Sequence, residues 1–312
     1  MNAYLGFDTS NYTTSVAVFS DNNISQIKKL LPVKQGEKGI RQSDAVFHHT
    51  KAYPALVTEL FEKCGNCNIK AVGASVTPTT QQGSYMPCFL VGEGVARSFA
   101  AINGIPFYAF SHQQGHIAAA LYSADRTELL EQRFLAFHIS GGTTDLILCE
   151  PGDNIFKTTL IACSSDLKAG QAVDRIGVKM GLAFPAGVGV EKLALNSEKS
   201  FKNKIKLKDG MCSLSGLENK CLKMLEIGET KEDVSKFLLT YIADTLTEML
   251  NNAFLEHGNM PVVFAGGVMS NSIIRKKIQS RFDASFAEPD FSCDNAAGTA
   301  LLASMKGVTP DE

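Results

Sequence analysis

The same hairpin pattern occurs twice in this chain, once at the N-terminus and once near the middle. Residues 5–18 read LGFDTSNYTTSVAV and residues 135–148 read LAFHISGGTTDLIL. Aligned without gaps, the two segments share a leucine, a phenylalanine, a serine and two threonines. These are Leu5, Phe7, Ser10, Thr13 and Thr14 in the first segment and Leu135, Phe137, Ser140, Thr143 and Thr144 in the second. A repeat fixes the architecture before any other feature does, so we expect a duplicated domain.

The turn of the second hairpin has the composition of an anion-binding loop. We expect Gly141 and Gly142 to adopt positive φ and to let the backbone approach a ligand closely. Successive turn amides, together with the hydroxyls of Ser140, Thr143 and Thr144, can form a concavity that binds a phosphate. Taken alone, an ordinary glycine-containing hairpin explains the turn equally well. The repetition favours the interpretation that each half carries a phosphate-facing turn.

Composition narrows the class of protein. The 312 residues allow about two domains, and 45% apolar with 20% charged residues is typical of a globular protein. The net charge of −2 neither favours nor excludes nucleic acid, so any basic surface must be local. No signal-like start and no apolar run of roughly 20 residues is present. The eight cysteines are scattered, with a single CxxC pair at Cys64 and Cys67, which fits reduced thiols. We therefore expect a cytoplasmic protein without a membrane segment.

Strand and helix patterns alternate along the chain. Helical spacing of apolar residues predicts helices over 48–63, 90–102 and 232–257, and apolar runs predict strands over 71–76 and 106–110. This alternation predicts mixed α/β layers.

Two histidines four residues apart are candidate metal ligands. His112 and His116 lie on one face of a helix that Ser111 would cap, and a third, oxygen ligand would complete a site for zinc or iron. A surface or core histidine pair is the more common explanation of this spacing. Gln113 stands where a zinc protease has its catalytic glutamate, so that chemistry is excluded. Asp294 either caps the last helix or supplies the missing ligand.

A second glycine turn follows the strand that ends at Ala265. Gly266 and Gly267 could let a base or ribose lie against the backbone, and Asn271 could bind it; a turn chosen for packing is the alternative. With the two hairpins, this order outlines the duplicated, two-lobed actin-like ATPase (ASKHA) fold, with mixed sheets flanked by helices. We expect lobes at residues 1–110 and 111–312, the second carrying the phosphate and adenosine turns. The helix from about Asp294 is expected to pack back on the first lobe.

Eight collinear motifs resemble the TsaD family (also called Kae1 or Gcp, formerly O-sialoglycoprotein endopeptidase). They extend over nearly the whole chain. The motifs are Asp8-Thr-Ser10, His112-x-x-x-His116, Ser140-Gly-Gly142, Ala169 to Asp174, Pro185-Ala-Gly187, Ser213 to Leu217, Ala265 to Asn271 and Cys293 to Ala297.

The resemblance implies an activity and a set of site residues. Members transfer a threonylcarbamoyl group from threonylcarbamoyl-adenylate to N6 of adenosine 37 in tRNA. It implies one Fe²⁺ or Zn²⁺ on His112, His116 and Asp294, with Asp8 and Asp294 at the reacting centre. It implies ATP, AMP or the adenylate bound by Ser10, Ile139, Ser140, Gly141, Gly142, Thr143, Asp174, Gly187, Glu191, Gly266, Gly267 and Asn271. It also implies tRNA, a smaller TsaB-like subunit and a TsaE-like ATPase as partners.

The departures from the family pattern indicate a divergent member. The family has Glu-Thr-Ser-Cys-Asp-Glu-Thr in the first hairpin, whereas Tyr12 and Thr13 replace the two consecutive acids here. Thr143 replaces a histidine, Glu191 replaces an aspartate, and the segment 77–83 replaces a Gly-Pro-Gly loop.

Other functions remain open at this point. A degenerate paralogue could serve as a nucleotide- and metal-binding scaffold or regulator, which the missing acids favour. A carbamoyl transferase using carbamoyl-adenylate is a second alternative, although the accompanying acylphosphatase and zinc-finger regions do not occur in this sequence. A sugar or acid kinase would leave the histidine pair unexplained. For tRNA, the basic stretches 199–208 and 275–277 are candidate contacts.

Overall fold

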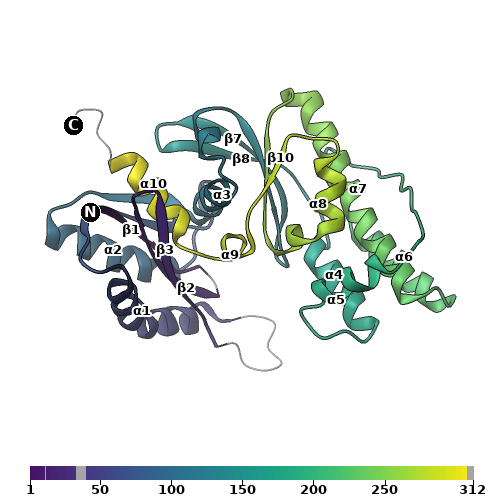
Figure 1. The fold of residues 1–312 in the computed structure, drawn as a ribbon, viewed down its shortest axis with the longest axis horizontal. Helices are drawn as coiled ribbons and strands as arrows, with labels where there is room; N and C mark the ends of the chain where they lie inside the picture. Colours follow the sequence, from purple (N-terminus) through teal and green to yellow (C-terminus); the bar gives the residue numbers. More distant parts are fainter. Residues whose placement is uncertain (11, 33–39, 308–312) are drawn as a thin grey trace. The chain divides into compact units, whose positions relative to one another are not determined.

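The structure, a computed structural model, describes residues 1–10, 12–32 and 40–307, so Asn11 of the first turn lies outside it. The chain forms two compact units (Figure 1). Unit 1 comprises Met1–Leu130, Pro151–Lys157 and Asp290–Glu312, and unit 2 comprises Glu131–Glu150 and Thr158–Pro289. No helix among the described residues has the length and apolar character needed to cross a bilayer.

Each unit is built on a five-stranded mixed sheet, and the two sheets have the same topology. The strand order is β3-β2-β1-β4-β5 in unit 1 and β8-β7-β6-β9-β10 in unit 2. The strands of the first sheet are β1 (Asn2–Asp8), β2 (Thr13–Ser20), β3 (Asn23–Leu30), β4 (Asn68–Thr77) and β5 (Phe107–Ser111). Those of the second are β6 (Phe134–Ile139), β7 (Thr144–Gly152), β8 (Ile155–Cys163), β9 (Val262–Ala265) and β10 (Ala284–Phe286).

The two hairpins also share their pairing register. Phe7 lies opposite Val16 in the β1–β2 pair, and Phe137 lies opposite Leu146 in the β6–β7 pair. These are the positions that the gapless sequence alignment superposes. The fourth strand of each sheet, β4 or β9, runs parallel to the first, as Leu5 pairs with Val72 and Leu135 with Val262. The duplicated mixed α/β fold predicted from the sequence is therefore confirmed.

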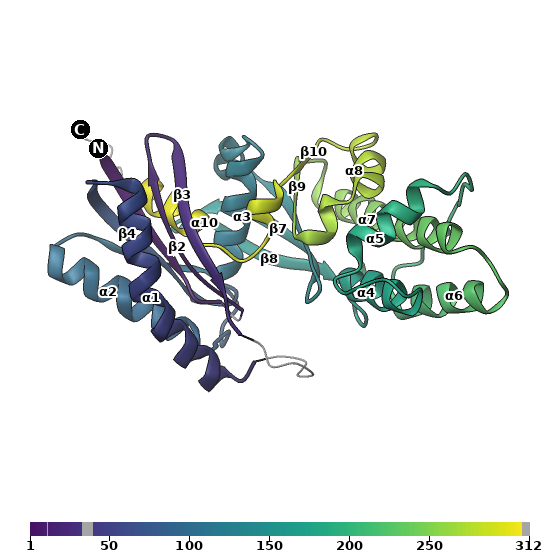
Figure 2. The same ribbon diagram turned by 60° about the horizontal axis from the view of Figure 1, so that its bottom comes forward.

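Helices cover both faces of the first sheet (Figure 2). On one face, α1 (Gln42–Cys64) and α2 (Phe89–Asn103) bury Leu5, Phe7 and their neighbours in a shared apolar core. On the other face, α10 (Ala297–Gly307) packs against β1, β4 and α3 (His112–Ser123). Successive strand residues point to opposite faces, so Gly6 faces α10. A Cβ on Gly6 would lie 2.5 Å from the Ala300 nitrogen, which shows how closely the helix approaches the strand.

The core of unit 2 lies between its sheet and the long helix α7 (Lys231–His257). Leu135, Phe137 and Ile139 of β6 belong to the same buried cluster as Leu246 and Leu250 of α7. Four shorter helices complete this unit: α4 (Ala169–Lys179), α5 (Gly187–Leu195), α6 (Ser215–Glu226) and α8 (Ser272–Gln279). Two short 3-10 segments, η1 (Thr127–Glu131) and η2 (Gly267–Ser270), and the four-residue helix α9 (Pro289–Ser292) complete the list of elements.

The predicted elements match closely, whereas the division into lobes differs. The helices predicted over 48–63, 90–102 and 232–257 correspond to α1, α2 and α7. We expected a boundary at residue 110, but residues 111–130 belong to unit 1. The reason is that α3 packs on α10 and on the first sheet.

Gly298→Ala tests the close contact between α3 and α10. A Cβ at residue 298 would collide with the backbone carbonyl of Gly115, and neither helix can yield without moving the sheet contacts. We expect the free energy of unfolding to fall by about 1–3 kcal/mol. Urea denaturation measures it.

Gly94→Ala is the matched control, because residue 94 lies on α2 and a Cβ there meets nothing within 4 Å. It should leave stability unchanged or raise it by about 0.5–1 kcal/mol. Equal stabilities for the two variants would contradict the proposed contact.

Candidate metal and nucleotide sites

Helix α3 begins with a capping box that fixes the position of its first residues. The Ser111 hydroxyl accepts from the Gln114 amide, and the Gln114 side chain accepts from the Ser111 amide. The cap makes His112 the first residue of the helix, and His116 follows one helical turn later. Their ring centroids are 4.3 Å apart. His116 is buried and His112 is partly buried. The expected cap and the expected shared face are both present.

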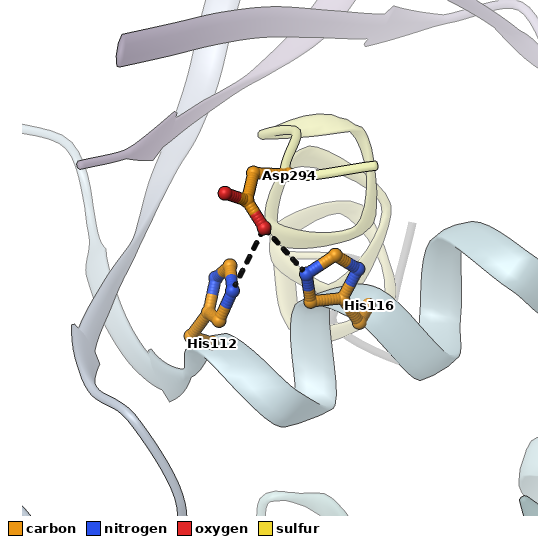
Figure 3. Close-up of side chains that lie close together, drawn as sticks. All are labelled: His112, His116 and Asp294. Carbon is orange, nitrogen blue, oxygen red and sulfur yellow. Dashed lines mark hydrogen bonds and ion pairs between the residues drawn. The ribbon is translucent and has the colours of Figure 1, made fainter. Parts of the chain in front are cut away.

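Asp294 lies between the two imidazoles, just before α10 (Figure 3). Its Oδ1 is 3.1 Å from Nε2 of His116 and 3.5 Å from Nε2 of His112. The three possible ligand atoms lie within 4.8 Å of one another. The cap of α10 is supplied by Asn295, whose Oδ1 accepts from the Ala297 amide. The interpretation of Asp294 as a simple helix cap is therefore wrong, because it faces the histidines.

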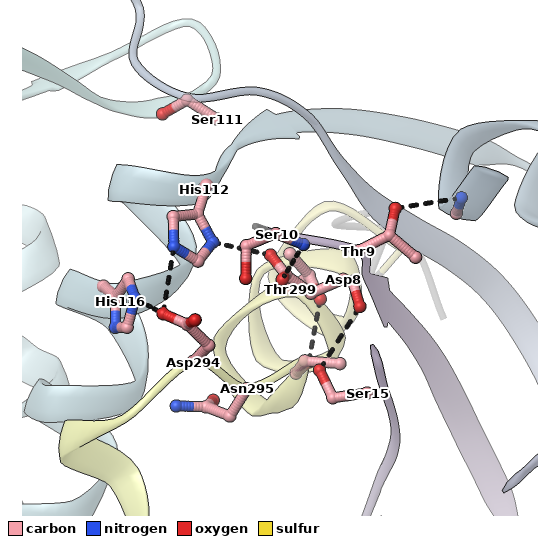
Figure 4. A network of polar contacts seen from close by, with 12 residues as sticks. Asp8, Thr9, Ser10, Ser15, Ser111, His112, His116, Asp294, Asn295 and Thr299 are labelled. Atoms are coloured by element: carbon pink, nitrogen blue, oxygen red, sulfur yellow. Dashed lines mark hydrogen bonds and ion pairs between the residues drawn. The ribbon is translucent and has the colours of Figure 1, made fainter. Parts of the chain in front are cut away.

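Asp8 fixes the orientation of the His112 ring (Figure 4). Its Oδ2 lies 2.7 Å from Nδ1 of His112, and its Oδ1 accepts from the Ser10 amide at 2.9 Å. The carboxyl is buried at the end of β1, and the Tyr53 hydroxyl donates to the Asp8 carbonyl. With Nδ1 engaged, the ring presents Nε2 to Asp294. Asp8, expected at the reacting centre, thus acts on His112 rather than lying among the three ligand atoms.

The charges of this cluster support one another. Burial alone would raise the pKa of Asp8 and of Asp294, but His112, with a smaller contribution from the Ser75 hydroxyl, holds the pKa of Asp8 below its usual range. His112 and His116 together hold the pKa of Asp294 well below its usual range. Burial would likewise lower the pKa of His112, but Asp8 and Asp294 outweigh it and raise this pKa to about 10. Two carboxylates in a buried site therefore attract positive charge.

The residues present fit a divalent transition metal. Two imidazole nitrogens and one carboxylate oxygen form a donor set used for zinc and for non-haem iron. A carboxylate that holds the other nitrogen of a ligating histidine is the usual second partner in such sites, and Asp8 has this position. His112, His116 and Asp294 could hold such an ion, and Asp8 could orient the first of them.

In unit 2, the turn between β6 and β7 is closed by its own serine. The Ser140 hydroxyl accepts from the amides of Gly142 and Thr143 at 3.1 and 3.2 Å and bonds to the Thr143 hydroxyl at 2.9 Å. These two amides are therefore occupied and do not face an anion. The expected positive φ at Gly141 and Gly142 is wrong. A Cβ at either position would meet nothing within 4 Å, so the turn is open to a ligand.

The helix starts of unit 2 are linked around this turn. The Gly170 amide donates to the Ser140 carbonyl, which joins α4 to the turn. Asp174 accepts from the Ala186 amide at 2.7 Å, which joins α4 to the start of α5 at Gly187.

Two further contacts continue these links. Glu191 of α5 accepts from the Ser272 amide at 2.7 Å, which joins α5 to the start of α8. Asn271 caps α8 by accepting from the Ile274 amide. The candidate nucleotide residues Asp174, Glu191 and Asn271 thus each bind a backbone amide, and each carboxylate has a second oxygen for a ligand hydroxyl.

The Gly266–Gly267 turn connects β9 to the same region. Gly266 has φ +99°, and a Cβ there would collide with the backbone of Ile139. Packing against β6 therefore explains this glycine. A Cβ on Gly267 would meet nothing within 4 Å. Ile139, also a candidate, is buried beneath the turn at the end of β6.

The first turn contains no acid in place of the two that the family pattern has. Thr13 is buried, Tyr12 is 37% exposed, and the Thr14 hydroxyl lies 2.8 Å from Nδ1 of His49 on α1. Burial lowers the pKa of His49 to about 4, so this histidine is neutral near pH 7. Ser10, a candidate ligand residue, is buried with its amide on Asp8.

Sequence reasoning missed Asp166. Its carboxylate accepts from the hydroxyls of Ser213 and Ser215 and from the amides of Leu214 and Leu167, which ties the loop before α4 to the start of α6. The Ser-x-Ser pattern before a helix was the available signal, but nothing in the sequence indicates which acid it would meet.

Comparison with known proteins identifies the family. The family model described as TsaD, tRNA N6-adenosine threonylcarbamoyltransferase, matches residues 18–301. The chain belongs to the TsaD family. A threonylcarbamoyltransferase of Thermus thermophilus is 30% identical over 305 residues, covering 96% of this chain and 91% of the relative. One of Streptococcus pneumoniae is 28% identical, again covering 96% and 91%.

Solved structures confirm the actin-like fold of this TsaD-family chain. Full-length HypF, at 12% identity, gives a TM-score of 0.61 and covers 97% of this chain and 55% of that one. Component A of the (R)-2-hydroxyglutaryl-CoA dehydratase of Acidaminococcus fermentans gives 0.58 at 16% identity, covering 99% and 100%. At these identities the likeness is one of fold alone.

Asp166→Asn tests the link between α4 and α6. Burial alone would raise the pKa of Asp166, but its hydrogen bonds hold it well below the usual range. The stabilisation is therefore present above the unfolded-state pKa of about 3.9 and is lost as pH falls through the folded-state pKa. We expect the variant to lose roughly 1–2 kcal/mol at neutral pH, a difference that shrinks in acid.

Urea denaturation across this pH range measures the difference. Asp209→Asn is the control, because Asp209 is exposed at positive φ, which asparagine tolerates. A difference between wild type and Asp166→Asn that does not change with pH would contradict the role of the ionised carboxylate.

Proposed function

We propose that this protein transfers a threonylcarbamoyl group from threonylcarbamoyl-adenylate to N6 of adenosine 37 of a tRNA. The observation that carries the proposal is the cluster of His112, His116 and Asp294, oriented by Asp8, in a chain of the TsaD family. In the reaction, the adenosine amine attacks the carbamoyl carbon, the new C–N bond forms, and the bond from that carbon to the phosphate oxygen breaks. AMP is the leaving group.

In this proposal, His112, His116 and Asp294 hold one Fe²⁺ or Zn²⁺. When bound, the metal would polarise the carbamoyl carbonyl and stabilise the charge that develops on its oxygen. Asp8 keeps Nε2 of His112 directed at the site by holding Nδ1. The two carboxylates balance the charge of the cation.

Residues of unit 2 are proposed to hold the nucleotide. The open face of the turn at Ser140, Gly141, Gly142 and Thr143 would receive the phosphate, and the hydroxyl hydrogen that the Ser140–Thr143 bond leaves free would donate to it. A second set would contact the ribose and base through carboxylate oxygens, an amide side chain and exposed backbone. This set is Asp174, Gly187, Glu191, Gly267 and Asn271; Gly266, also expected here, is buried against Ile139.

A nucleotide- and metal-binding scaffold is the second candidate function. The observation that favours it is the uncharged first turn, where Tyr12 and Thr13 replace acids and His49 is neutral. If the protein is a transferase, the first turn offers no carboxylate to accept the proton of the attacking amine. That proton must pass to solvent, to the phosphate or to another group. Family membership supports tRNA as a partner. A TsaB-like subunit and a TsaE-like ATPase are further proposed partners.

His116→Ala tests the metal site. The purified wild type should bind about one equivalent of Fe²⁺ or Zn²⁺, since three protein ligands form a usable site. The variant should bind the metal at least about tenfold more weakly. Loss of a residue that merely hydrogen-bonds a metal ligand already lowers metal affinity by about 10–100-fold, and His116 is itself a proposed ligand. Metal analysis after dialysis measures the content. A rise in melting temperature on adding metal provides a readout independent of activity.

His257→Ala is the control, because His257 is the last residue of α7 in unit 2 and far along the chain from the cluster. It should retain full metal content. Equal metal binding by His116→Ala and wild type would reject the site, and a wild type that binds no added metal would do the same.

The transfer itself is tested with unmodified tRNA, threonylcarbamoyl-adenylate and the partner proteins. Mass spectrometry of the digested tRNA should show the modified nucleoside with the wild type. His112→Ala should lower its rate by roughly 100-fold or more, because the site loses a ligand and the group that Asp8 holds.

Product formed by wild type but not by His112→Ala would show that the acids missing from the first turn are dispensable. If metal and adenylate bind but no product forms, the scaffold is the correct function. His257→Ala again serves as the control and should form product at the wild-type rate.

A further inference from the structure

A row of four lysines projects from one side of an extended segment in unit 2. The segment runs from α5 toward α6, and residues 201–208 alternate strictly between half-buried and exposed positions. The half-buried residues are Phe201, Asn203, Ile205 and Leu207, and the exposed ones are Lys202, Lys204, Lys206 and Lys208. We call these four exposed lysines the lysine row.

The half-buried side of the segment is anchored on α7. Phe201 packs edge-on against Phe237 with ring centroids 5.4 Å apart. Asn203 donates to Asp244 at 3.0 Å, and Leu207 packs against the core of the unit. Because these contacts hold three of the four half-buried residues, the lysine row lies on a supported backbone.

The backbone of this segment joins neither sheet. Residues 201–207 have no helix or strand assignment, and Lys208 makes a single bridge to Met211. Lysines on an exposed extended segment often prevent it from pairing with a strand of another molecule. That role would explain one or two of these lysines. It does not explain four in succession on a segment already anchored by its other side.

The charges of the lysine row are not neutralised by neighbours. Across the described ranges of the chain, none of its four lysines forms an ion pair, whereas Lys199 pairs with Glu229 and Asp233 at 2.6 and 2.9 Å. A cavity of ≈ 300 Å³ beside Lys202 is lined by Lys277 and Arg281 but also by Asp244 and Glu248, so charges of both signs lie at that end of the row.

Two of the three residues in the other basic stretch of this unit are engaged within the protein. The Arg275 guanidinium lies 4.9 Å from the centre of the Phe286 ring, and Lys277 pairs with Asp244, whereas Lys276 is exposed. Of the two candidate tRNA contacts in the sequence, the lysine row is therefore the one that presents several exposed cations in succession.

We propose that the lysine row binds the phosphodiester backbone of the tRNA acceptor. Alternate residues of an extended chain are spaced by about 6.6 Å, close to the separation of successive phosphates along an RNA strand. Lysine binds phosphate as a flexible point charge without reading sequence, as a backbone contact requires. The proposal rests on the proposed function, because that function makes tRNA the substrate.

The test substitutes all four lysines of the row by glutamine in the full-length protein. Binding of unmodified tRNA is measured by fluorescence anisotropy between about 50 and 200 mM salt, with partner proteins present. We expect tRNA affinity to fall about 10–100-fold and the slope of log K against log salt to become shallower by about 3, since up to four phosphate contacts are lost. The quadruple lysine-to-arginine variant should retain affinity and slope.

The matched control removes four exposed lysines outside the row, Lys29, Lys63, Lys70 and Lys223, and so changes the net charge equally. It should bind tRNA nearly as the wild type does. Metal content and melting temperature establish that each variant is folded.

Three outcomes would overturn the proposal. If the glutamine variant keeps the wild-type affinity and slope, the row does not bind tRNA, while the proposed function stands. If transfer falls but tRNA affinity does not, the row serves a protein partner. If the wild type itself binds no tRNA above the level of a competing polyanion, both the row and the acceptor assignment fail.

Discussion

The close approach of α10 to the first sheet and to α3 is the constraint on which the candidate metal site depends. Gly6 and Gly73 let α10 lie against β1 and β4, and Gly298 lets it touch the Gly115 backbone. Residues far apart in the sequence are thereby held at fixed separation. Asp294 immediately precedes α10, so the same contact delivers its carboxylate to the histidines of α3.

The electrostatics of the cluster follow from this packing. The buried carboxylate of Asp8 and the half-buried carboxylate of Asp294 lie beside two imidazoles. This charge is tolerated because each carboxylate has a hydrogen-bonded partner. Without a metal, the surplus negative charge is met by a proton on His112, whose pKa is raised to about 10. Metal and proton therefore compete for one site, which is typical of histidine ligands.

The two hairpins share one pairing register but carry different polar side chains at equivalent positions. At equivalent positions, the first strand ends in Asp8, which holds a candidate metal ligand, whereas the second has His138. Gly6 and Gly73 of the first sheet make room for a helix, whereas Gly141 and Gly142 have open space around them. The segment 201–208, which lies outside both sheets, adds a further surface. Its half-buried residues anchor it to unit 2, and its exposed residues are the four lysines of the row.

The sequence by itself determined the repeated hairpins, the main helices and the histidine pair, because these depend on local periodicity and on a comparison of the chain with itself. The i, i+4 spacing of His112 and His116 required only a helix. The positive φ expected at Gly141 and Gly142 was wrong, because the Ser140 hydroxyl closes that turn from within.

Only the tertiary structure decided which groups meet. The contact of Asp294 with His116, the contact of Asp8 with His112, and the hydrogen bonds from Ser213 and Ser215 to Asp166 all join residues distant in sequence. Such contacts depend on how helices pack across a sheet. Local sequence patterns carry no information about which distant residues that packing brings together. The placement of α3 in unit 1 rather than in the second lobe has the same physical origin.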